Sequence, residues 1–471
     1  MKPLLALQAA TTLTFAAFLP ITASAEAPAK PNILILFTDD QGYADLGVQG
    51  SEDIPTPHID SLAHNGVRCT SGYVSSPMCS PSRAGIVTGR SQSRFGHDVN
   101  WHPQWPVDPN DTRGLPLTEK TFGDQLQAAG YHTGVIGKWH LGEAPPFHPN
   151  RRGFDEFFGF ISGGHNYNTA SYRDTPPVHH YSTLLERNGE SQPATPGYLT
   201  EVLGEESAAF IHRNKEKPWL LYASFNAPHT PIQAPPELIE RVKHIENENR
   251  RTYAAMIVSL DDAVGRILQQ LRDDGLEERT LIFFLTDNGG TTENNTSSNA
   301  PLRGRKGQMW EGGIRVPFLV QWKGVLPAGT TYDRPVTSLD ILPTALAAAG
   351  ASSIASEPLD GTDLMPYLTE ESSEDPHDAL FWRIALRDIW AVRSGDYKLV
   401  RQNNNVNLYD LSADITETRD LSNQLPEVRQ RLQKTFDEWE KSLPEPLWEI
   451  YPTPEIEAAE RQRRMRNNPQ S

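Results

Sequence analysis

The sequence predicts an α/β fold in which a large, doubly wound and mainly parallel sheet is flanked by helices. Continuous apolar runs at 32–37 and 281–285 are typical of strands that are buried on both faces. Such runs alternate along the chain with segments of helical spacing, as expected for strand–helix–strand units. The C-terminal part is predicted to add a smaller α+β subdomain with a short antiparallel sheet.

The predicted elements follow one another in the order that this fold requires. The first strand, 32–37, ends in two acidic residues and a glycine turn. Three further strands each follow a helical segment: 133–136 after 121–129, 219–225 after 199–213, and 281–285 after 253–271. In the C-terminal part, short strands are predicted at 390–393, 397–401 and 407–409, followed by a helix at 425–443.

The chain of 471 residues is long enough for more than one domain. Residues 1–25 are interpreted as a signal peptide, because Lys2 precedes an apolar stretch and small residues at 23–25 form a cleavage site. Residues 26–375 are predicted to form the main domain, and 376–471 the C-terminal subdomain with a charged tail. The stretch 352–378 is rich in Ser, Pro, Glu and Asp, which favours a linker or surface crossing.

The formal net charge of −17 argues against a general affinity for nucleic acid or anionic lipid. No run after the signal peptide reaches the roughly 18 to 20 apolar residues needed to cross a bilayer, so no stable membrane insertion is expected. An exported protein is predicted, located in the periplasm or the medium if the host is bacterial. In such a compartment, Cys69 and Cys79 would ordinarily form a disulfide.

Polar side chains gather where the predicted strands end. Ligands of open α/β sheets bind beyond the carboxyl ends of the strands, so these scattered groups are expected to converge. They are Asp39 and Asp40 after the first strand, Lys138 and His140 after the second, Asn226 and His229 after the third, and Asp287 and Asn288 after the fourth.

A further informative segment is Cys79-Ser80-Pro81-Ser82-Arg83, followed by Thr88-Gly89-Arg90. Pro81 suits the first turn of a helix, which places Cys79 near a positive helix terminus that stabilises a thiolate. Arg83 adds a fixed positive charge one turn later. Taken alone, a cysteine near a helix start is more often structural or disulfide-bonded than catalytic.

The segment resembles the maturation motif of the formylglycine-dependent (type I) sulfatases of the alkaline-phosphatase-like superfamily. Other blocks similar to this family occur in the family's order along most of the chain: 36–42, 137–142, 227–231, 286–290 and 306–317. Each block is weak evidence alone, whereas their joint order favours a catalytic sulfatase domain at 26–375.

The resemblance implies that a formylglycine-generating or sulfatase-maturating enzyme converts Cys79 into 3-oxoalanine (formylglycine), whose hydrate is the nucleophile. Cys69 would then remain a free thiol. The resemblance also implies a site for Ca²⁺, with Mg²⁺ as an alternative, and oxygen ligands suit both ions. The implied ligands are Asp39, Asp40, Cys79 in its modified form, Asp287 and Asn288. Capping of turns and helices is the competing explanation for isolated Asp and Asn residues.

The resemblance gives roles to the other catalytic candidates. Lys138 and Lys306 would bind sulfate oxygens, and Arg83 would hold the aldehyde hydrate. One hydroxyl of the hydrate would attack sulfur in line while His229, helped by Lys306, protonates the leaving oxygen. His140 would then remove a proton from the remaining hydroxyl, so that sulfate is expelled and the aldehyde returns.

Two polar loops bear on the substrate. The loop at 94–105 contains His97, Asn100, Trp101, His102 and Trp105, and a Gly-rich loop at 163–167 contains His165. Aromatic faces beside polar tips suit sugar rings, and ordinary loop packing is an equally weighted alternative. The predicted substrate-binding residues are Lys138, His229, Lys306, His165 and Asn100.

The sequence therefore predicts an exported sulfatase that acts on a sulfated polysaccharide or its oligosaccharides, with a carrageenan-like galactan as a guess within that class. A small-aryl sulfatase and a phosphate or phosphonate monoester hydrolase are the alternatives within the superfamily. A catalytically inactive protein that binds sulfated glycans is the alternative from a different class.

Overall fold

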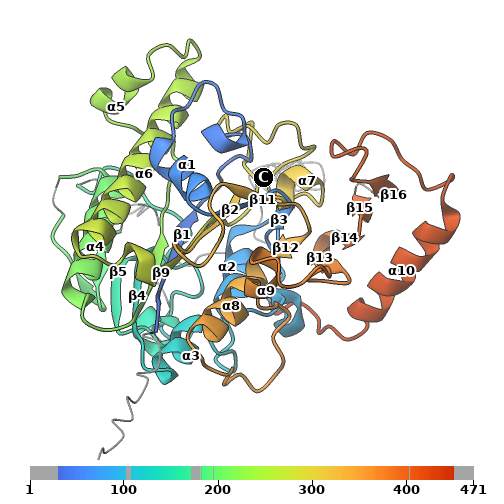
Figure 1. Ribbon diagram of the computed structural model, residues 1–471, viewed down its shortest axis with the longest axis horizontal. Coiled ribbons are helices and arrows are strands. Elements are labelled where there is room, and N and C mark those ends of the chain that lie inside the picture. The colour runs from blue at the N-terminus through green and yellow to red at the C-terminus, as the bar shows by residue number, and fades with distance from the viewer. Residues whose placement is uncertain are drawn as a thin grey trace, which may run out of the picture.

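The computed structural model describes residues 30–101, 108–170, 181, 183–194, 196–402 and 404–449. The predicted signal peptide, His102, Trp105 and the charged tail at 455–471 lie outside the described residues. Figure 1 shows a large sheet covered by helices, with a smaller orange and red unit beside it. The predicted fold class is confirmed. Within the ranges described, no helix combines the length and the apolar character that a bilayer crossing requires.

The centre of the main sheet consists of parallel strands. β1 (Asn32–Thr38) lies between β8 (Trp219–Ser224) and β9 (Thr280–Thr286), and beyond β8 follow β4 (His132–Lys138) and β5 (Glu156–Phe160). The margins are completed by β10 (Phe318–Gln321), β2 (Val67–Cys69) and β11 (Thr330–Tyr332) next to β9, and by β6 (Glu186–Arg187) and β7 (Glu190–Ser191) next to β5. The four strands predicted in the main domain are therefore adjacent at the centre of the sheet. A separate pair joins β3 (Gly72–Tyr73) and β12 (Val336–Thr337).

Successive residues of the central strands face two separate hydrophobic cores. On β1, Leu34 and Leu36 pack into one core, whereas Ile33, Ile35 and Phe37 pack into the other. The first core is covered by α1 (Pro57–His64), α4 (Leu199–Asn214), α5 (Pro236–Arg241) and α6 (Glu248–Asp273). The second is covered by α2 (Cys79–Thr88), α3 (Phe122–Ala128), α8 (Ile341–Ala348) and α9 (Met365–Leu368). Figure 1 shows these two helix layers on opposite faces of the sheet.

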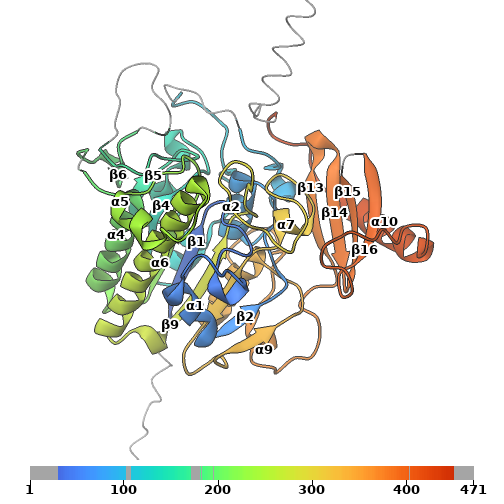
Figure 2. The ribbon, with the colours of Figure 1, turned by 90° about the horizontal axis from the view of Figure 1, so that it is seen from above.

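The C-terminal unit is an antiparallel sheet that packs against one helix (Figure 2). Its elements are β13 (Leu380–Ile384), β14 (Ile389–Ser394), β15 (Tyr397–Gln402), β16 (Asn405–Asp410) and α10 (Pro426–Glu440). The prediction missed β13, and the stretch 352–378 is more than a linker because it contains α9 and supplies a core residue, Leu368. The boundary at residue 375 stays a prediction.

Buried ionic contacts join the C-terminal sheet to the main domain. Lys398 on β15 is fully buried and donates to Glu311 Oε1 and Glu417 Oε1, both at 2.8 Å. Glu311 begins α7 (Glu311–Ile314), and its other carboxylate oxygen accepts from the Tyr73 hydroxyl at 2.6 Å. Burial by itself would raise the pKa of Glu311, but the positive charges led by Lys398 outweigh burial and lower that pKa to about 2.

Lys398→Met is expected to lower the free energy of unfolding by about 3–5 kcal/mol, because two buried carboxylates would lose their shared cation. The measurement is urea-induced unfolding at neutral pH. Lys434→Met is the matched control, since Lys434 is exposed and lies 3.7 Å from Glu438; its cost should stay within about 0.5 kcal/mol. Equal costs for the two variants would show that this buried contact does not stabilise the fold.

Candidate active site

Cys79 lies at the start of a buried helix, as the sequence predicted. It is the first residue of α2, follows the N-cap residue Met78, and has 2% of its surface exposed. The backbone N–H of Ser80 donates to Asn100 Oδ1 at 3.0 Å, so Asn100 satisfies one of the donors that a helix start leaves open. Cys69 and Cys79 are both free, which makes the disulfide interpretation wrong.

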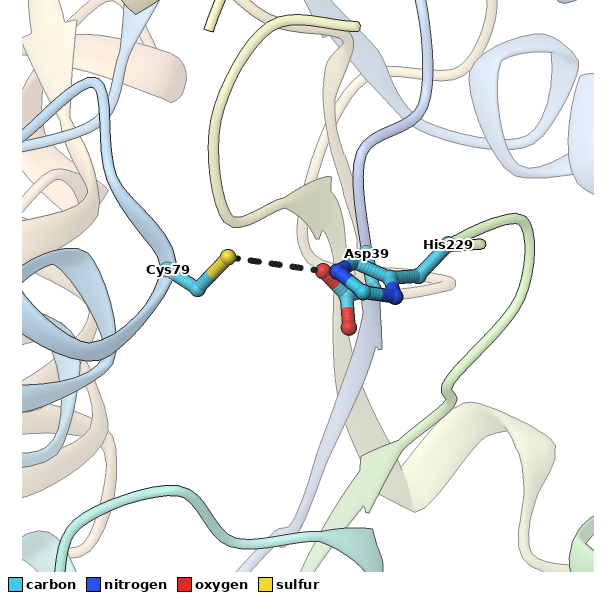
Figure 3. Close-up of side chains that lie close together, drawn as sticks. All are labelled: Asp39, Cys79 and His229. Carbon is cyan, nitrogen blue, oxygen red and sulfur yellow. Dashed lines mark hydrogen bonds between the residues drawn. The ribbon is translucent and has the colours of Figure 1, made fainter. Parts of the chain in front are cut away.

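The Cys79 sulfur lies between a carboxylate and an ammonium group. Sγ is 3.8 Å from Asp39 Oδ1, the contact drawn in Figure 3, and 2.7 Å from Lys306 Nζ. Burial raises the pKa of the thiol to about 12, although Lys306 and Lys138 lower it in part. For the unmodified side chain, loss of hydration is therefore the larger effect, and the expected stabilisation of a thiolate by the helix terminus stays a prediction.

Four of the five predicted metal ligands form one cluster. Single ligand atoms of Asp39, Asp40, Cys79 and Asp287 all lie within 4.8 Å of one another, and all four residues are buried. The fifth, Asn288, reaches the cluster through Nδ2, which donates to Asp40 Oδ1 at 2.7 Å. Its Oδ1 is buried without a hydrogen-bond partner among the described residues. Such an atom and three carboxylates suit a hard divalent cation such as Ca²⁺ or Mg²⁺.

Three cations contact the three carboxylates of this cluster. The shortest contacts join Lys138 Nζ to Asp39 Oδ2 at 2.5 Å, Arg83 Nη2 to Asp287 Oδ2 at 2.9 Å, and Lys306 Nζ to Asp40 Oδ1 at 2.6 Å. The charges of the side chains therefore balance. A divalent cation would leave an excess of positive charge, which favours the binding of an anionic ester.

The carboxylates differ in their affinity for protons. Burial by itself would raise the pKa of Asp40, but the positive charge and hydrogen bond of Lys306 outweigh burial and lower that pKa to about 2. The pKa of Asp287 is raised to about 6 by burial and by the negative charge of Asp39, although Arg83 acts in the opposite direction. A metal ion that offsets the charge of Asp39 would therefore stabilise the ionised form of Asp287.

The two candidate histidines are positioned differently, His229 by a hydrogen bond from its ring to the backbone and His140 by its place directly after β4. His229 Nδ1 donates to the Thr230 carbonyl at 2.6 Å, which directs Nε2 to a point 3.6 Å from Asp40 Oδ2. His140 follows β4 with a positive φ of 56°, and its Nδ1 has no hydrogen-bond partner among the described residues. A Cβ on Gly163 would lie 2.8 Å from His140 Nε2, so the close approach of this loop requires glycine.

Both imidazoles are neutral in this environment. Burial lowers the pKa of His229 to about 3, and Lys138 and Lys306 add to the effect, whereas Asp40 opposes it. Burial and the same two lysines also hold the pKa of His140 well below its usual range. An anion bound beside His229 would raise its pKa and allow its Nε2 to act as a proton donor.

The structure also places residues in the site that the sequence analysis missed. Ser224, at the end of β8, accepts from Arg83 Nη1 at 2.6 Å and donates to the Lys138 carbonyl at 2.7 Å. Tyr181 lies edge-on to His229, with ring centroids 6.1 Å apart. The position of Ser224 at a strand end was the available signal. Tyr181 lies far from every motif in the sequence and had no such signal.

The proposed substrate contacts of Asn100 and His165 stay predictions. Asn100 Oδ1 is engaged by the start of α2, as described above. The His165 ring is buried, with Nδ1 2.6 Å from the Asn166 carbonyl and Nε2 2.8 Å from the Thr183 carbonyl. These contacts give His165 a role in holding its loop. From the loop at 94–101, Trp101 packs against His140 with ring centroids 5.2 Å apart.

Fold and site together define a hydrolase of anionic esters in the alkaline-phosphatase-like class. The chain belongs to the sulfatase family: the Sulfatase family model matches residues 31–351, and the model for the C-terminal part of N-sulphoglucosamine sulphohydrolase matches residues 305–442. It is accordingly a sulfuric ester hydrolase, and both the predicted family and the predicted enzyme class are confirmed.

Similar proteins include sulfatases of different organisms. The Escherichia coli protein "Uncharacterized sulfatase YdeN" is 31% identical over 93% of this chain and 90% of its own. The N-acetylgalactosamine-6-sulfatase of Canis lupus familiaris is 35% identical over 73% of this chain and 67% of its own. The crystal structure of Ps i-CgsB in complex with k-i-k-neocarrahexaose superposes with a TM-score of 0.84, at 34% identity over 94% of this chain and 98% of that one.

Proposed function

We propose that this chain is an exported carbohydrate sulfatase whose nucleophile is the hydrate of a formylglycine derived from Cys79. The observation that carries this proposal is the position of Cys79 at a helix start, within 4.8 Å of three carboxylates and beside Lys306. The thiol has too high a pKa to serve as a ready nucleophile. An aldehyde hydrate at the same position would instead present oxygen atoms to the cluster.

Asp39, Asp40, Asp287 and Asn288 would hold the divalent cation, which we propose to be Ca²⁺, together with an oxygen of the modified residue 79. In the present structure, the Cys79 sulfur occupies the position of that oxygen. When bound, the ion would neutralise carboxylate charge and favour ionisation of the attacking hydroxyl. The unpaired Asn288 Oδ1 supports this ligand set.

The protein's own side chains would then carry the reaction. Lys138 and Lys306 would bind the sulfate oxygens, and Arg83 would orient the hydrate. His229 would protonate the leaving oxygen through Nε2, because its Nδ1 is already committed to the Thr230 carbonyl. Lys306 can assist, since its Nζ and His229 Nε2 both lie next to the Asp40 carboxylate.

His140 would complete the cycle by taking a proton from the second hydroxyl of the hydrate. Its Nδ1 has no competing partner among the described residues, and neutral imidazole is the form that accepts a proton. Sulfate would leave as the carbonyl reforms, so water would not attack sulfur directly.

A sulfated carbohydrate is the substrate class that the similar proteins favour. Ps i-CgsB was crystallised with a neocarrahexaose, and the name of the canine relative also specifies a sugar sulfate. A carrageenan-like galactan is our specific proposal. Because Cys79 is 2% exposed, its oxidation by a maturation enzyme would have to precede folding around it.

Peptide mass spectrometry and parallel assays test this function. The protein would be produced together with a formylglycine-generating enzyme, and the peptide spanning 69–83 would be weighed. We expect an aldehyde at residue 79 and release of sulfate from carrageenan oligosaccharides, with much slower turnover of matched phosphate esters. An active preparation with an intact thiol would contradict the nucleophile. Turnover of a small aryl sulfate alone would favour the aryl-sulfatase alternative.

A further inference from the structure

Arg387, from the C-terminal sheet, lies beside Gly307, the residue that follows the catalytic candidate Lys306. It ends the short turn Ala385–Arg387 between β13 and β14 and is partly buried. A Cβ built on Gly307 would meet only one atom within 4 Å, Arg387 Nη1 at 3.5 Å. The guanidinium therefore lies next to the backbone of the residue that follows Lys306, and the Lys306 side chain is itself 19% exposed.

Among the described residues, nothing compensates the positive charge of Arg387. No described residue accepts a hydrogen bond or forms an ion pair with it, and burial alone accounts for its lowered pKa. The positively charged residues in strands β13 to β16 of the C-terminal sheet, by contrast, all have partners. These pairs are Arg383 with Asp98, Arg393 with Tyr73, Lys398 with Glu311 and Glu417, and Arg401 with Asp388. A partly buried guanidinium without a partner is costly unless an anion binds to it.

Several contacts attach the segment beside Arg387 both to the C-terminal sheet and to the start of α2. The segment that carries Lys306 is attached to the C-terminal sheet, because Met309 N–H donates to Gln402 Oε1 at 2.9 Å and Glu311 N–H donates to Glu417 Oε2 at 2.7 Å. On its other side, Gly307 N–H donates to the Pro77 carbonyl at 2.8 Å, two residues before Cys79.

Arg387 and Lys306 differ in the groups that they contact. Lys306 contacts both Cys79 and Asp40, whereas none of the catalytic charges shifts the pKa of Arg387. Arg387 therefore is not a member of the catalytic cluster, although it lies beside the backbone that carries Lys306. An anion that it binds would belong to a part of the substrate other than the ester that is cleaved.

We propose that Arg387 is a substrate-binding residue that holds a second anionic oxygen group of the substrate, adjacent to the ester that reacts. The inference rests on the proposed carbohydrate sulfatase function and narrows its preferred substrates to sugars with more than one negative charge. A sulfate and a carboxylate each present a pair of oxygen atoms that can accept two parallel hydrogen bonds from one guanidinium.

The test compares Arg387→Met with Arg401→Met in the fully matured enzyme. Arg401 lies on the same sheet but is paired with Asp388, so its loss is the matched control. The substrates are galactan oligosaccharides of equal length with one sulfate or with several, a uronic acid oligosaccharide with one sulfate, and a small aryl sulfate. For substrates with a second anion, Arg387→Met should raise KM about ten- to hundredfold with kcat little changed.

The other substrates and the conservative variant also have specific expected results. The aryl sulfate and the singly sulfated sugar should be unaffected by Arg387→Met, and Arg387→Lys should restore part of the affinity. A loss of affinity confined to the multiply sulfated substrates would identify the second anionic group as a sulfate. A loss of affinity confined to the uronic acid substrate would identify it as a carboxylate. Equal losses on all substrates, or none on any, would overturn the proposal. Wild-type turnover of the aryl sulfate alone would overturn the carbohydrate function as well.

Discussion

Cys79→Ala should abolish the hydrolysis of sulfate esters while leaving the fold intact. We expect a loss on the order of 10⁴-fold or more in kcat, because the variant cannot form the aldehyde that supplies the attacking hydroxyl. The methyl group of alanine fits the buried position, and Lys306 retains its contact with Asp40. The measurement is sulfate release under single-turnover and steady-state conditions, with circular dichroism to verify the fold.

Cys69→Ala is the matched control for this variant. Cys69 is also a buried free cysteine, but it lies on β2, and its thiol is absent from the cluster around Asp39. Its replacement should leave kcat within about threefold of the wild type, since effects at sites without contact to the reacting atoms are small. Near-normal turnover by Cys79→Ala would refute the nucleophile assignment, whatever the mass of the wild-type peptide.

The central part of the fold was predictable because burial leaves a clear pattern in the sequence. β1 and β9 are covered on both faces, so every residue in them is buried and the apolar runs are unbroken. The polar residues that follow these strands converge because parallel strands end at the same edge of a sheet. The positions of Asp39, Asp40 and Asp287 could therefore be inferred before the structure was known.

The margins of the sheet leave no comparable pattern. β2 is only three residues long, and no residue of β11 is fully buried, so neither strand contains an apolar run. The prediction missed β13 because contacts with residues far away in the sequence, rather than a local pattern, hold this strand beside β14. Its Trp382 indole donates to the Val74 carbonyl at 2.6 Å, a partner more than 300 positions away. Local sequence cannot specify such contacts.

The residues that connect the C-terminal sheet to the active site were also beyond sequence reasoning. Lys398 is fully buried, although lysine in a short strand is normally exposed. Arg387 follows no motif, and its interest arises only because the fold brings it beside Gly307. Ser224 could have been noticed at its strand end, but its contact with Arg83, 141 positions away, is made only by the folded chain.

Removal of the divalent cation should have the second large effect. Thorough chelation of the matured enzyme is expected to remove turnover, and Ca²⁺ should restore it more fully than Mg²⁺, because flexible all-oxygen sites suit the larger ion. At a hundredfold excess over its Kd, the ion should also add about 2.7 kcal/mol to the free energy of unfolding. Metal content, turnover and thermal unfolding would be measured on the same samples.

Asp287→Asn separates the metal ligand from the rest of the site. The variant should lose both turnover and the stabilisation by Ca²⁺, because Asp287 supplies one of three carboxylates in the cluster. Asp262→Asn is the matched control, since Asp262 belongs to another acidic group, with His58 and Asp261, that lies apart from Cys79. The Asn variant also removes the shorter of the two ion pairs of Arg83, the other being with Asp39 at 3.6 Å, so the chelation of wild-type protein is the independent measurement. Full turnover in a verified metal-free sample would exclude a catalytic role for the ion, even if Asp287→Asn were inactive.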